Sequence, residues 1–470
     1  MQKWTKLAGL AVLGFSVVTG CASNQATSVD QIESRTGGHK TYLDDASLEA
    51  FDADLRALAL AVHRGEEDNE SALLTKISEN ARVYQTALLS ALHDDDSEAR
   101  RRVAAIALGF TGDSSVIPLL ILKVDNEDEP EGIRLNAMLG LSRMGDKLRD
   151  FSEHGALMTV INNQLGSSEA SYQMRRTAIG TFTVAFDGAQ DDSILPLRNR
   201  FLGDPDLNVQ IAAITAMGDI GDPAAVQDLT IVGLRHPDFD IRLNAAIALG
   251  KINDPANVVP ALLNAALDES AVVRREVIGA LANHYGSDPD TVFTTIQNAL
   301  ADFYPRVRES SAMALAQISD TRAITPLIQA TGDRTAVVRT AAAAALGDIL
   351  PHDREKEGFP LVDLLADPNP GVQNACLGSL VRISKVDHGN DQGRWRTYFY
   401  TKYPDLDPAK KYDGKPRPRV YKSTGNNSRA RNTRTSGSRN NSRNTRNNSS
   451  RTNRRTNNSR NSRNRDNRRG

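Results

Sequence analysis

The sequence is poor in cysteine and in aromatic residues. Only two cysteines, Cys21 and Cys376, occur in 470 residues, and two cannot make the disulfide framework of a small secreted protein. Aromatic residues make up 5% of the chain and hydrophobic residues 40%, with Ala and Leu prevailing among them. Ala and Leu favour helices, whereas aromatic and β-branched residues favour strands. The composition therefore predicts helices, and the length predicts several domains or one elongated array.

Signature motifs of several enzyme classes are also missing. The chain has no glycine-rich phosphate loop, no G-x-S-x-G elbow and no C-x-x-C pair, which would indicate nucleotide binding, hydrolase or redox chemistry. Its eight histidines, among them His154, His236, His284 and His352, fall mostly in predicted turns or helix ends. Their spacing does not suit a shared metal ion. We therefore expect no catalytic residue, no metal site, no cofactor and no enzymatic activity.

The first residues of the chain have the layout of an export signal. A basic start precedes an apolar run over residues 7–18, which is too short for a comfortable membrane span. Val18, Thr19, Gly20 and Cys21 resemble the lipobox of bacterial lipoproteins, in which the cysteine sulfur is acylated and the chain is cut just before it. The resemblance implies a protein that is anchored to a membrane by lipid at Cys21.

The segment after the cysteine refines this expectation. Ala22 follows the cysteine in place of Asp, which is similar to the pattern of lipoproteins sorted to the outer membrane. We expect a signal peptide at 1–20, a flexible tether at 21–45, and a lipid-anchored protein of the cell envelope, on the outer membrane facing the periplasm. The alternative is an ordinary signal peptide in which Cys21 is incidental.

One short pattern recurs along the chain. The stretch FDIRLNAAIALGKINDP, at residues 239–255, aligns with eight others on its arginine, at spacings of 31 to 41 residues. Small or apolar residues follow three, four and seven positions after this marker, as on one face of a helix. The spacing is typical of two-helix solenoid units, with a helix A before each marked helix B. The markers are Arg101, Arg134, Arg175, Gln210, Arg242, Arg274, Arg308, Arg339 and Gln373.

The residues before each marker predict how helix B begins. Seven repeats carry a side chain four positions earlier that can accept hydrogen bonds from the free N–H groups of a helix start. The other two have Pro130 and Tyr304, the latter followed by Pro305, and still favour a turn or a helix start. The predicted N-caps are Ser97, Ser171, Asp206, Asp238, Ser270, Thr335 and Asn369.

Carboxylates recur six residues before the markers. An arginine early in a helix lies at the positive end of the helix dipole, so a nearby carboxylate is the expected compensation. We predict a structural ladder of turn carboxylates and helix B arginines along the array, rather than a row of catalytic acids. Its members include Asp95, Arg101, Asp128, Arg134, Asp268, Arg274, Asp302, Arg308, Asp333 and Arg339. The same register holds Glu169, Asp204, His236 and Asp367.

The repeated pattern resembles HEAT repeats, specifically the short subtype first noted in phycobilisome lyases. IRLNAAIALGKINDP, VVRTAAAAALGDI and VQIAAITAMGDIGDP carry the resemblance. It implies an all-α fold, an α-solenoid of about nine HEAT-like two-helix repeats over residues 79–386, in which each unit buries its apolar face against its neighbours. The resemblance is weakest at the second and third units, where 41 residues separate Arg134 from Arg175.

The ends of such an array need covers. Residues 46–78 are predicted to supply an N-terminal capping helix, with its apolar pattern over residues 47–63. Residues 387–412 gather an aromatic cluster that includes Trp395, Tyr398 and Phe399, and we predict that these side chains form a C-terminal cap. An aromatic ligand site at that end is the alternative.

Some HEAT-repeat proteins are enzymes. Those similar to deoxyhypusine hydroxylase bind two irons through His-Glu pairs, and this sequence has no His-Glu dipeptide. Cys376 occupies the register position of Ala245 and Ala342, which favours a small buried core residue over a nucleophile. A lyase-like or cofactor-handling enzyme or chaperone on a HEAT scaffold is the alternative to a binding protein.

The C-terminal segment is strongly basic. Residues 415–470 hold 18 Lys or Arg and the single acid Asp466, a charge of +17, and the rest of the chain carries −18. Residues 413–470 have no apolar face to bury and are predicted to be disordered. We expect residues 424–470 to contact an anionic envelope polymer or an acidic partner. Self-association, solubility and nucleic-acid binding are the alternatives, and export makes nucleic acid unlikely as a partner.

Together these patterns predict a lipid-anchored scaffold or docking protein of the cell envelope. It would bind protein partners, whose identity the residues do not indicate, through its HEAT-repeat surface. The basic segment would add electrostatic adhesion. Nucleic-acid binding through the arginine-rich segment becomes the expectation only if the export signal is wrong.

Overall fold

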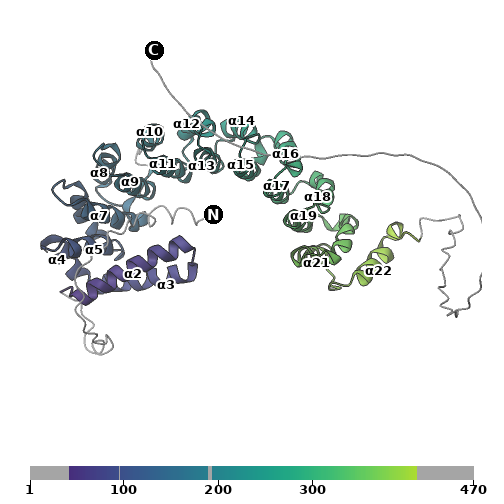
Figure 1. The fold of residues 1–470 in the computed structure, drawn as a ribbon, viewed down its shortest axis with the longest axis horizontal. Coiled ribbons are helices and arrows are strands. Elements are labelled where there is room, and N and C mark those ends of the chain that lie inside the picture. Colours follow the sequence, from purple (N-terminus) through teal and green to yellow (C-terminus); the bar gives the residue numbers. More distant parts are fainter. Residues whose placement is uncertain (1–41, 95, 189–192, 410–470) are drawn as a thin grey trace, which may run out of the picture. The chain divides into compact units, whose positions relative to one another are not determined.

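The computed structural model describes residues 42–94, 96–188 and 193–409, and this part of the chain is helical without a strand. The helices follow one another in pairs in chain order (Figure 1). The chain divides into two units, Met1–Lys411 and Tyr412–Gly470, and the second lies outside the described residues. So do the predictions at Val18, Thr19, Gly20 and Cys21, and the one on the basic segment.

The marked helices begin where the sequence predicts. Within the described residues all nine start one position after the expected N-cap position, and thus three positions before the marker, which leaves the marker in the first turn. They are α5 (Glu98–Leu108), α7 (Glu131–Arg143), α9 (Tyr172–Ala185), α11 (Leu207–Ile220), α13 (Phe239–Leu249), α15 (Ala271–Asn283), α17 (Pro305–Ile318), α19 (Ala336–Ile349) and α21 (Pro370–Ser384). The predicted α-solenoid of two-helix repeats is confirmed.

A shorter helix A precedes each of these B helices, often with a single 3₁₀ turn at one end. The A helices are α4 (Gln85–Asp94), α6 (Ile117–Asp125), α8 (His154–Gly166), α10 (Leu195–Gly203), α12 (Val226–Ile231), α14 (Pro255–Ala265), α16 (Pro289–Asn298), α18 (Ile324–Ala330) and α20 (Pro360–Asp363). We call the connection from helix A to helix B the A–B turn.

The predicted N-cap residues occupy the N-cap position in all seven repeats. Five of them accept a hydrogen bond from a backbone N–H of the first turn, as Asp206 does from Val209 and Asn369 from Val372. Ser270 and Thr335 hold the position without such a bond. At Thr335 the hydroxyl accepts from the Arg308 guanidinium instead, at 3.3 Å, so the cap takes part in a contact between repeats.

The core follows the register read from the sequence. In the first eight B helices the side chains three, four and seven positions after the marker are at most 2% exposed, for example Ala245, Ala246 and Leu249. Successive B helices approach closely because small residues meet there. A Cβ placed on Gly218 of α11 would lie 2.6 Å from the Cα of Ala248 in α13. The small residues therefore set the distance between neighbouring repeats.

The N-terminal cap differs from its prediction. The helix predicted over residues 47–63 is α2 (Asp45–Arg64), but the capping region 46–78 also holds a second helix, α3 (Glu67–Val83), where one was expected. Gly65 ends α2 in the left-handed conformation with φ 68°, and its N–H bonds back to the last turn. Glycine adopts this conformation at little cost, which makes it a common helix terminator.

At the other end, α22 (Gln392–Lys402) lies within the predicted cap, residues 387–412. Across the described residues no helix combines the length and the apolar character needed to cross a membrane.

Candidate functional site

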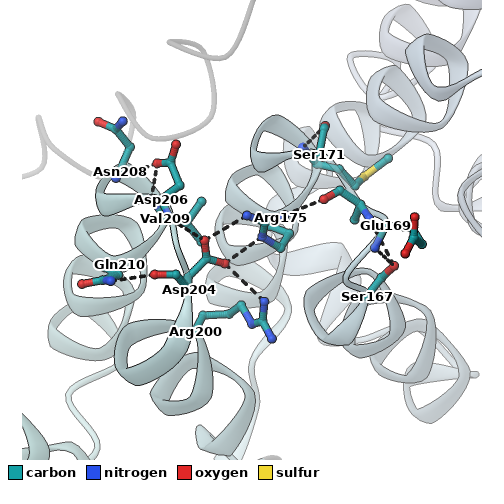
Figure 2. Close-up of polar contacts among 12 residues, drawn as sticks. Ser167, Glu169, Ser171, Arg175, Arg200, Asp204, Asp206, Asn208, Val209 and Gln210 are labelled. Carbon is teal, nitrogen blue, oxygen red and sulfur yellow. Dashed lines mark hydrogen bonds and ion pairs between the residues drawn. The ribbon is translucent and has the colours of Figure 1, made fainter.

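The best-formed polar site links one repeat to the next (Figure 2). Arg175 of α9 donates two hydrogen bonds to Asp204, in the A–B turn before α11, at 2.7 Å from Nε and 2.9 Å from Nη2. Its remaining nitrogen, Nη1, donates to the backbone oxygen of Ala170. The side chains of Arg175 and Asp204 are 9% and 0% exposed. Arg200 adds a third donor to the carboxylate at 3.2 Å.

The same arrangement recurs towards the C-terminus. Each arginine makes a two-bond ion pair with a carboxylate 25 to 28 residues later, with Nε–Oδ2 distances of 2.7 to 2.8 Å. Its third nitrogen donates to the backbone oxygen of the residue six positions before it. The pairs are Arg242–Asp268, Arg274–Asp302, Arg308–Asp333 and Arg339–Asp367. We call these four pairs and Arg175–Asp204 the Arg/Asp ladder.

Each ladder carboxylate also organises its own turn. Asp268, for example, accepts a hydrogen bond from the backbone N–H of Ser270, two residues later, at 2.8 Å. Burial raises the pKa of Asp302, but the hydrogen bonds from Arg274 and from the Tyr304 N–H outweigh it and hold that pKa below its usual value. The hydrogen bond to Asp302 raises the pKa of Arg274. Both groups are therefore charged at neutral pH.

The ladder joins repeats, which the sequence register did not reveal. Each ladder aspartate lies six residues before an arginine of the same repeat. That arginine bonds to the backbone oxygen of the aspartate and not to its carboxylate, as Arg308 does at Asp302. The carboxylate itself turns to the arginine of the preceding repeat. Such partly buried, two-bond pairs fix the orientation of one unit against the next.

The register changes at two repeats. Gln210 replaces the arginine in α11 and donates to the backbone oxygen of Asp204 at 2.7 Å, while His236 stands where the next carboxylate would be. Gln373, in the last B helix, donates to the backbone oxygen of Asp367 in the same way. Both glutamines thus keep the hydrogen bond to the backbone oxygen six residues earlier in their own repeat, but they make no ion pair with the next repeat.

The ladder prediction is wrong at the first two markers. Arg101 comes closest to Glu129, at 4.0 Å, and not to Asp128. Arg134 donates to the backbone oxygen of Val124 and to the amide oxygen of Gln164. In the turn before α7 it is the next residue, Glu129, that faces Arg101 of α5 and Lys123 of α6. The aligned carboxylate, Asp128, therefore does not pair with Arg101. Asp95 lies outside the described residues.

The aromatic cluster packs against the last repeat. Trp395 and Phe399 of α22 are 0% exposed, and the indole N–H of Trp395 donates to the backbone oxygen of Gly389 at 2.8 Å. The Tyr398 hydroxyl lies 3.1 Å from the Lys402 amine. That amine also bonds the fully buried Glu355 carboxylate, and this hydrogen bond raises the pKa of Lys402. Glu355 could not be predicted from local patterns because its partners, Lys402 and Tyr403, lie 47 and 48 residues away in the chain.

The remaining polar candidates do not converge on a reactive centre. Cys376 is fully buried in α21, and burial raises the pKa of its thiol to about 12, which leaves it protonated and unreactive at neutral pH. In the described part of the chain no three His, Cys, Asp or Glu side chains gather as metal ligands would. The predictions of no metal and no catalytic residue stay predictions.

An open groove of about 630 Å³ lies between α17 and α19. Its floor is apolar and small, with Ala341 and Ala344, and the 61% exposed Met313 stands beside it. Glu309 and Asp348 flank it, but each is already paired, with Arg306 and with Arg382. The groove has room for a side chain or a short segment of a partner.

A second surface was missed by the sequence reasoning, which looked for binding residues on the B helices. Large apolar side chains are exposed in the A–B turns of five successive repeats, from α9 to α17. The signal was present in the sequence as apolar residues at or just before the first position of helix B, among polar turn residues. These side chains are Tyr172, Leu207, Phe239, Leu267, Phe303 and Tyr304, with 43% to 87% of their surface exposed. We call this set the A–B strip.

The comparisons with known proteins agree with this architecture. The family model described as HEAT repeats matches residues 163–233, 230–294 and 293–381. Its matches cover the part of the chain that holds the Arg/Asp ladder and the A–B strip. No curated protein matches the sequence.

Among solved structures, yeast importin-beta (Kap95p) is similar over 84% of this chain and 54% of its own, with 14% identity and a TM-score of 0.51. A Kap95:Nup1 complex is similar over 82% of this chain and 52% of its own, with 14% identity and a TM-score of 0.50. Human deoxyhypusine hydroxylase covers 65% of this chain and 97% of its own, with 19% identity and a TM-score of 0.25, which is too low to support an inference.

This chain thus spans about half the length of the importin-beta structures it matches, and the likeness shows the fold alone. The described residues form an α-solenoid that contains HEAT repeats between residues 163 and 381.

Proposed function

We propose that this protein is a non-enzymatic docking scaffold of the cell envelope, anchored by lipid at Cys21 on the outer membrane facing the periplasm. Its HEAT-repeat array would bind protein partners. The observation that carries the binding role is that large apolar side chains are exposed at five successive A–B turns, since exposed apolar patches are typical of interaction sites. The Kap95:Nup1 complex offers an analogy of fold for a solenoid with a protein partner.

The anchoring role rests on the residue pattern Val18-Thr19-Gly20-Cys21 after an apolar run. Several acyl chains, at roughly 0.8 kcal/mol per buried CH₂, would hold the chain on a bilayer without a membrane-spanning helix. The basic residues 424–470 would add contacts with anionic lipid head groups, lipopolysaccharide or wall polymers. A tether at one end and a basic segment at the other would let the array bridge a membrane and a second anionic surface.

The first test is mass spectrometry of the mature N-terminus, beside a Cys21→Ala variant, together with membrane fractionation. We expect a chain that begins at an acylated Cys21 and sediments with membranes, and a variant that is released. An intact Met1 in the cytosol would refute the envelope role, and residues 424–470 should then be tested against RNA and DNA across a salt series.

The bridging role has a separate test. The full chain and a chain that ends at residue 423 are compared in pull-downs from envelope fractions, where the full chain should retain anionic polymers that the shorter one loses. Identical retention by both would exclude the bridging role and leave the anchor and the binding surface untouched.

A further inference from the structure

The Arg/Asp ladder has one gap. From α9 to α19 every B helix except α11 is joined to the next A–B turn by an arginine and an aspartate. After α11 the two positions of the pair hold Gln210 and His236, and the Gln210 amide donates to the backbone oxygen of Asp204 in its own repeat. We call the A–B turn before α13, residues 232–238, the His236 turn.

Other contacts hold the same two repeats together. Lys251, just after α13, pairs with Asp219 at the end of α11, at 2.6 Å, and Arg198 of α10 pairs with Asp228 of α12. The small residues of α11 and α13 pack backbone against backbone. The repeats are therefore joined along their helices, while the turn side lacks the ion pair found at the other junctions. Movement at the turn would pivot on these contacts.

His236 shapes its turn through a ring nitrogen. Its Nδ1 accepts a hydrogen bond from the Asp238 N–H at 3.1 Å, just as the Asp268 carboxylate accepts one from the N–H of Ser270. A ring nitrogen that accepts a hydrogen bond carries no proton, so this bond requires the neutral ring with its proton on Nε2. Protonation of Nδ1 removes the acceptor and sets one N–H against another.

The charges around the His236 turn do not oppose a cationic ring. Arg242 donates to the backbone oxygen of His236 at 2.8 Å, but it is itself paired with Asp268 and Glu269. Carboxylates outnumber cations on the elements packed against the turn, so the loss of the acceptor decides the effect of protonation. Apart from the Asp219–Lys251 pair at the far end of α11, these groups are Arg175, Arg198, Arg200, Asp204, Asp206, Asp228, Arg235, Asp238, Asp240, Arg242, Asp268 and Glu269.

We propose that the His236 turn is a pH-sensitive joint in the array. Histidine changes its charge between pH 5 and 8. As pH falls through that range, His236 gains a proton and releases the Asp238 N–H, and the turn that orients the α13 repeat against the α11 repeat loosens. The ladder pairs keep the repeats on either side rigid, so the array bends at this one junction. The proposal is independent of the lipid anchor and of the docking role.

Hydrogen exchange of the full chain at pH 7.5 and pH 5, expressed as protection factors, tests the local change. The amides of residues 236–242 should lose about threefold to tenfold in protection at pH 5, as expected for one hydrogen bond. The turn before α15, residues 266–270, contains no histidine and is the internal control, which should change less than about twofold. The free energy of global unfolding should change little, because the helix contacts remain.

Variants identify the group that titrates. His236→Asp supplies a carboxylate, which is the acceptor in the other ladder turns and stays ionised at pH 5. It should keep the protection seen at pH 7.5 and abolish the dependence on pH. Gln210→Arg combined with His236→Asp rebuilds the missing pair and should raise protection at both pH values by about threefold or more. His63→Asn, at an exposed histidine of α2, is the matched control and should keep the dependence on pH.

Spin labels measure the orientation of the repeats. Labels at Leu202→Cys and Leu267→Cys span the joint, and labels at Leu267→Cys and Arg334→Cys, an equal number of repeats apart, lie on one side of it. These positions are exposed, whereas Cys376 is buried, and Cys21→Ser removes the other native thiol. The distribution of distances should broaden at pH 5 for the first pair and stay unchanged for the second.

Three results would overturn the proposal. Equal protection of residues 236–242 at both pH values would show that the turn does not respond to acid. A response that persists in His236→Asp would assign it to another group. A local loss of protection with unchanged distances between the first pair of labels would show that the turn opens without moving the repeats. None of these results depends on a lipid or a partner, so they do not bear on the proposed function.

Discussion

The two ends of the array are joined differently. The A–B turns before α15, α17, α19 and α21 are each tied to the preceding repeat by an arginine and an aspartate with two hydrogen bonds. At α5 and α7 the arginines occupy the same register, yet Arg101 has only a 4.0 Å approach to Glu129 and Arg134 bonds to neutral oxygens. The marker arginine therefore makes a two-bond ion pair only where the turn of the next repeat places a carboxylate within its reach.

The difference shows that the arginine alone does not define the repeat. The pairing needs a carboxylate in the following turn, at a place that depends on the length of helix A and its loops. Between Arg134 and Arg175 the spacing grows to 41 residues, and the extra turn Gly145–Leu148 precedes α8. The family model matches from residue 163 onwards, which is where the regular pairing begins.

Close backbone packing is common to both ends. Gly109 at the end of α5 meets the backbone of Gly140 in α7, as Gly218 meets Ala248 further on. Small residues thus set the spacing between B helices towards both ends, while the Arg/Asp ladder fixes the A–B turns in one part only. Four substitutions or conditions test this division.

The largest effect is expected from Arg308→Met. The change removes the two guanidinium hydrogen bonds of the Asp333 carboxylate and the Arg308 hydrogen bonds of the Asp302 and Phe303 backbone oxygens. Removing one partner of a buried pair costs about 3–5 kcal/mol. Arg101→Met, whose side chain is 25% exposed and makes one long contact, should cost about 1 kcal/mol or less.

Urea unfolding followed by circular dichroism measures both variants, and hydrogen exchange shows which repeats open, since a solenoid can unfold locally. Equal losses in Arg308→Met and Arg101→Met would show that the two ends are joined equally well.

Gly109→Ala should have the next largest effect. The new Cβ would lie 2.2 Å from the backbone oxygen of Gly140, and backbone cannot move aside as a side chain can. Overpacking of this kind costs about 1–3 kcal/mol. The loss should appear as faster hydrogen exchange in α5 and α7 with little change beyond α13. An unchanged melting temperature would mean that these helices are free to separate.

Acid should loosen the C-terminal repeats before the N-terminal ones. Hydrogen bonds from Arg322 and Tyr285 lower the pKa of Asp320 to about 2, and the pKa values of Asp302, Asp333 and Asp367 are also lowered. A carboxylate with a lowered folded-state pKa adds stability that is complete above its unfolded pKa and is lost as pH falls through the folded value. For Asp320 the window is therefore about pH 4 to 2.

Unfolding measured at pH 7, 5, 4 and 3 should show a flat profile down to about pH 4 and a loss below it. Asp320→Asn should lower the free energy of unfolding at pH 7 and reduce the further loss of that free energy below pH 4. A loss that begins near pH 6 would point to histidines and not to these carboxylates.

The smallest effect is a gain. Gly180→Ala, in α9, adds a methyl group with no atom within 4 Å, and Gly within a helix is less stable than Ala by about 0.5–1 kcal/mol. The melting temperature should rise slightly. A lower melting temperature would mean that a methyl group at position 180 meets neighbouring atoms after all, contrary to the open space around it.

Much of the fold could be predicted because it is written in local patterns. The starts of all nine B helices and the buried positions after each marker follow from N-cap chemistry and the helical period, which act over a few residues. The division of the N-terminal cap at Gly65 was missed, since the helical pattern continues on both sides and only the left-handed φ of 68° breaks it. Among the site residues, Trp395 and Phe399 were predicted to belong to the C-terminal cap because they are aromatic. The buried Glu355 was not predicted.

The sequence by itself determined the repeat, the helix boundaries and the apolar faces that each unit must bury. The tertiary structure decided which oxygen each arginine reaches, which glycines meet backbone and which turn residues stay exposed. Arg242 and Asp268 are 26 residues apart, and their pairing exists only once two units are stacked. Similarly, Phe239 and Leu267 stay exposed because the stacking of repeats, and not the local helical period, decides which residues at the A–B turns are covered.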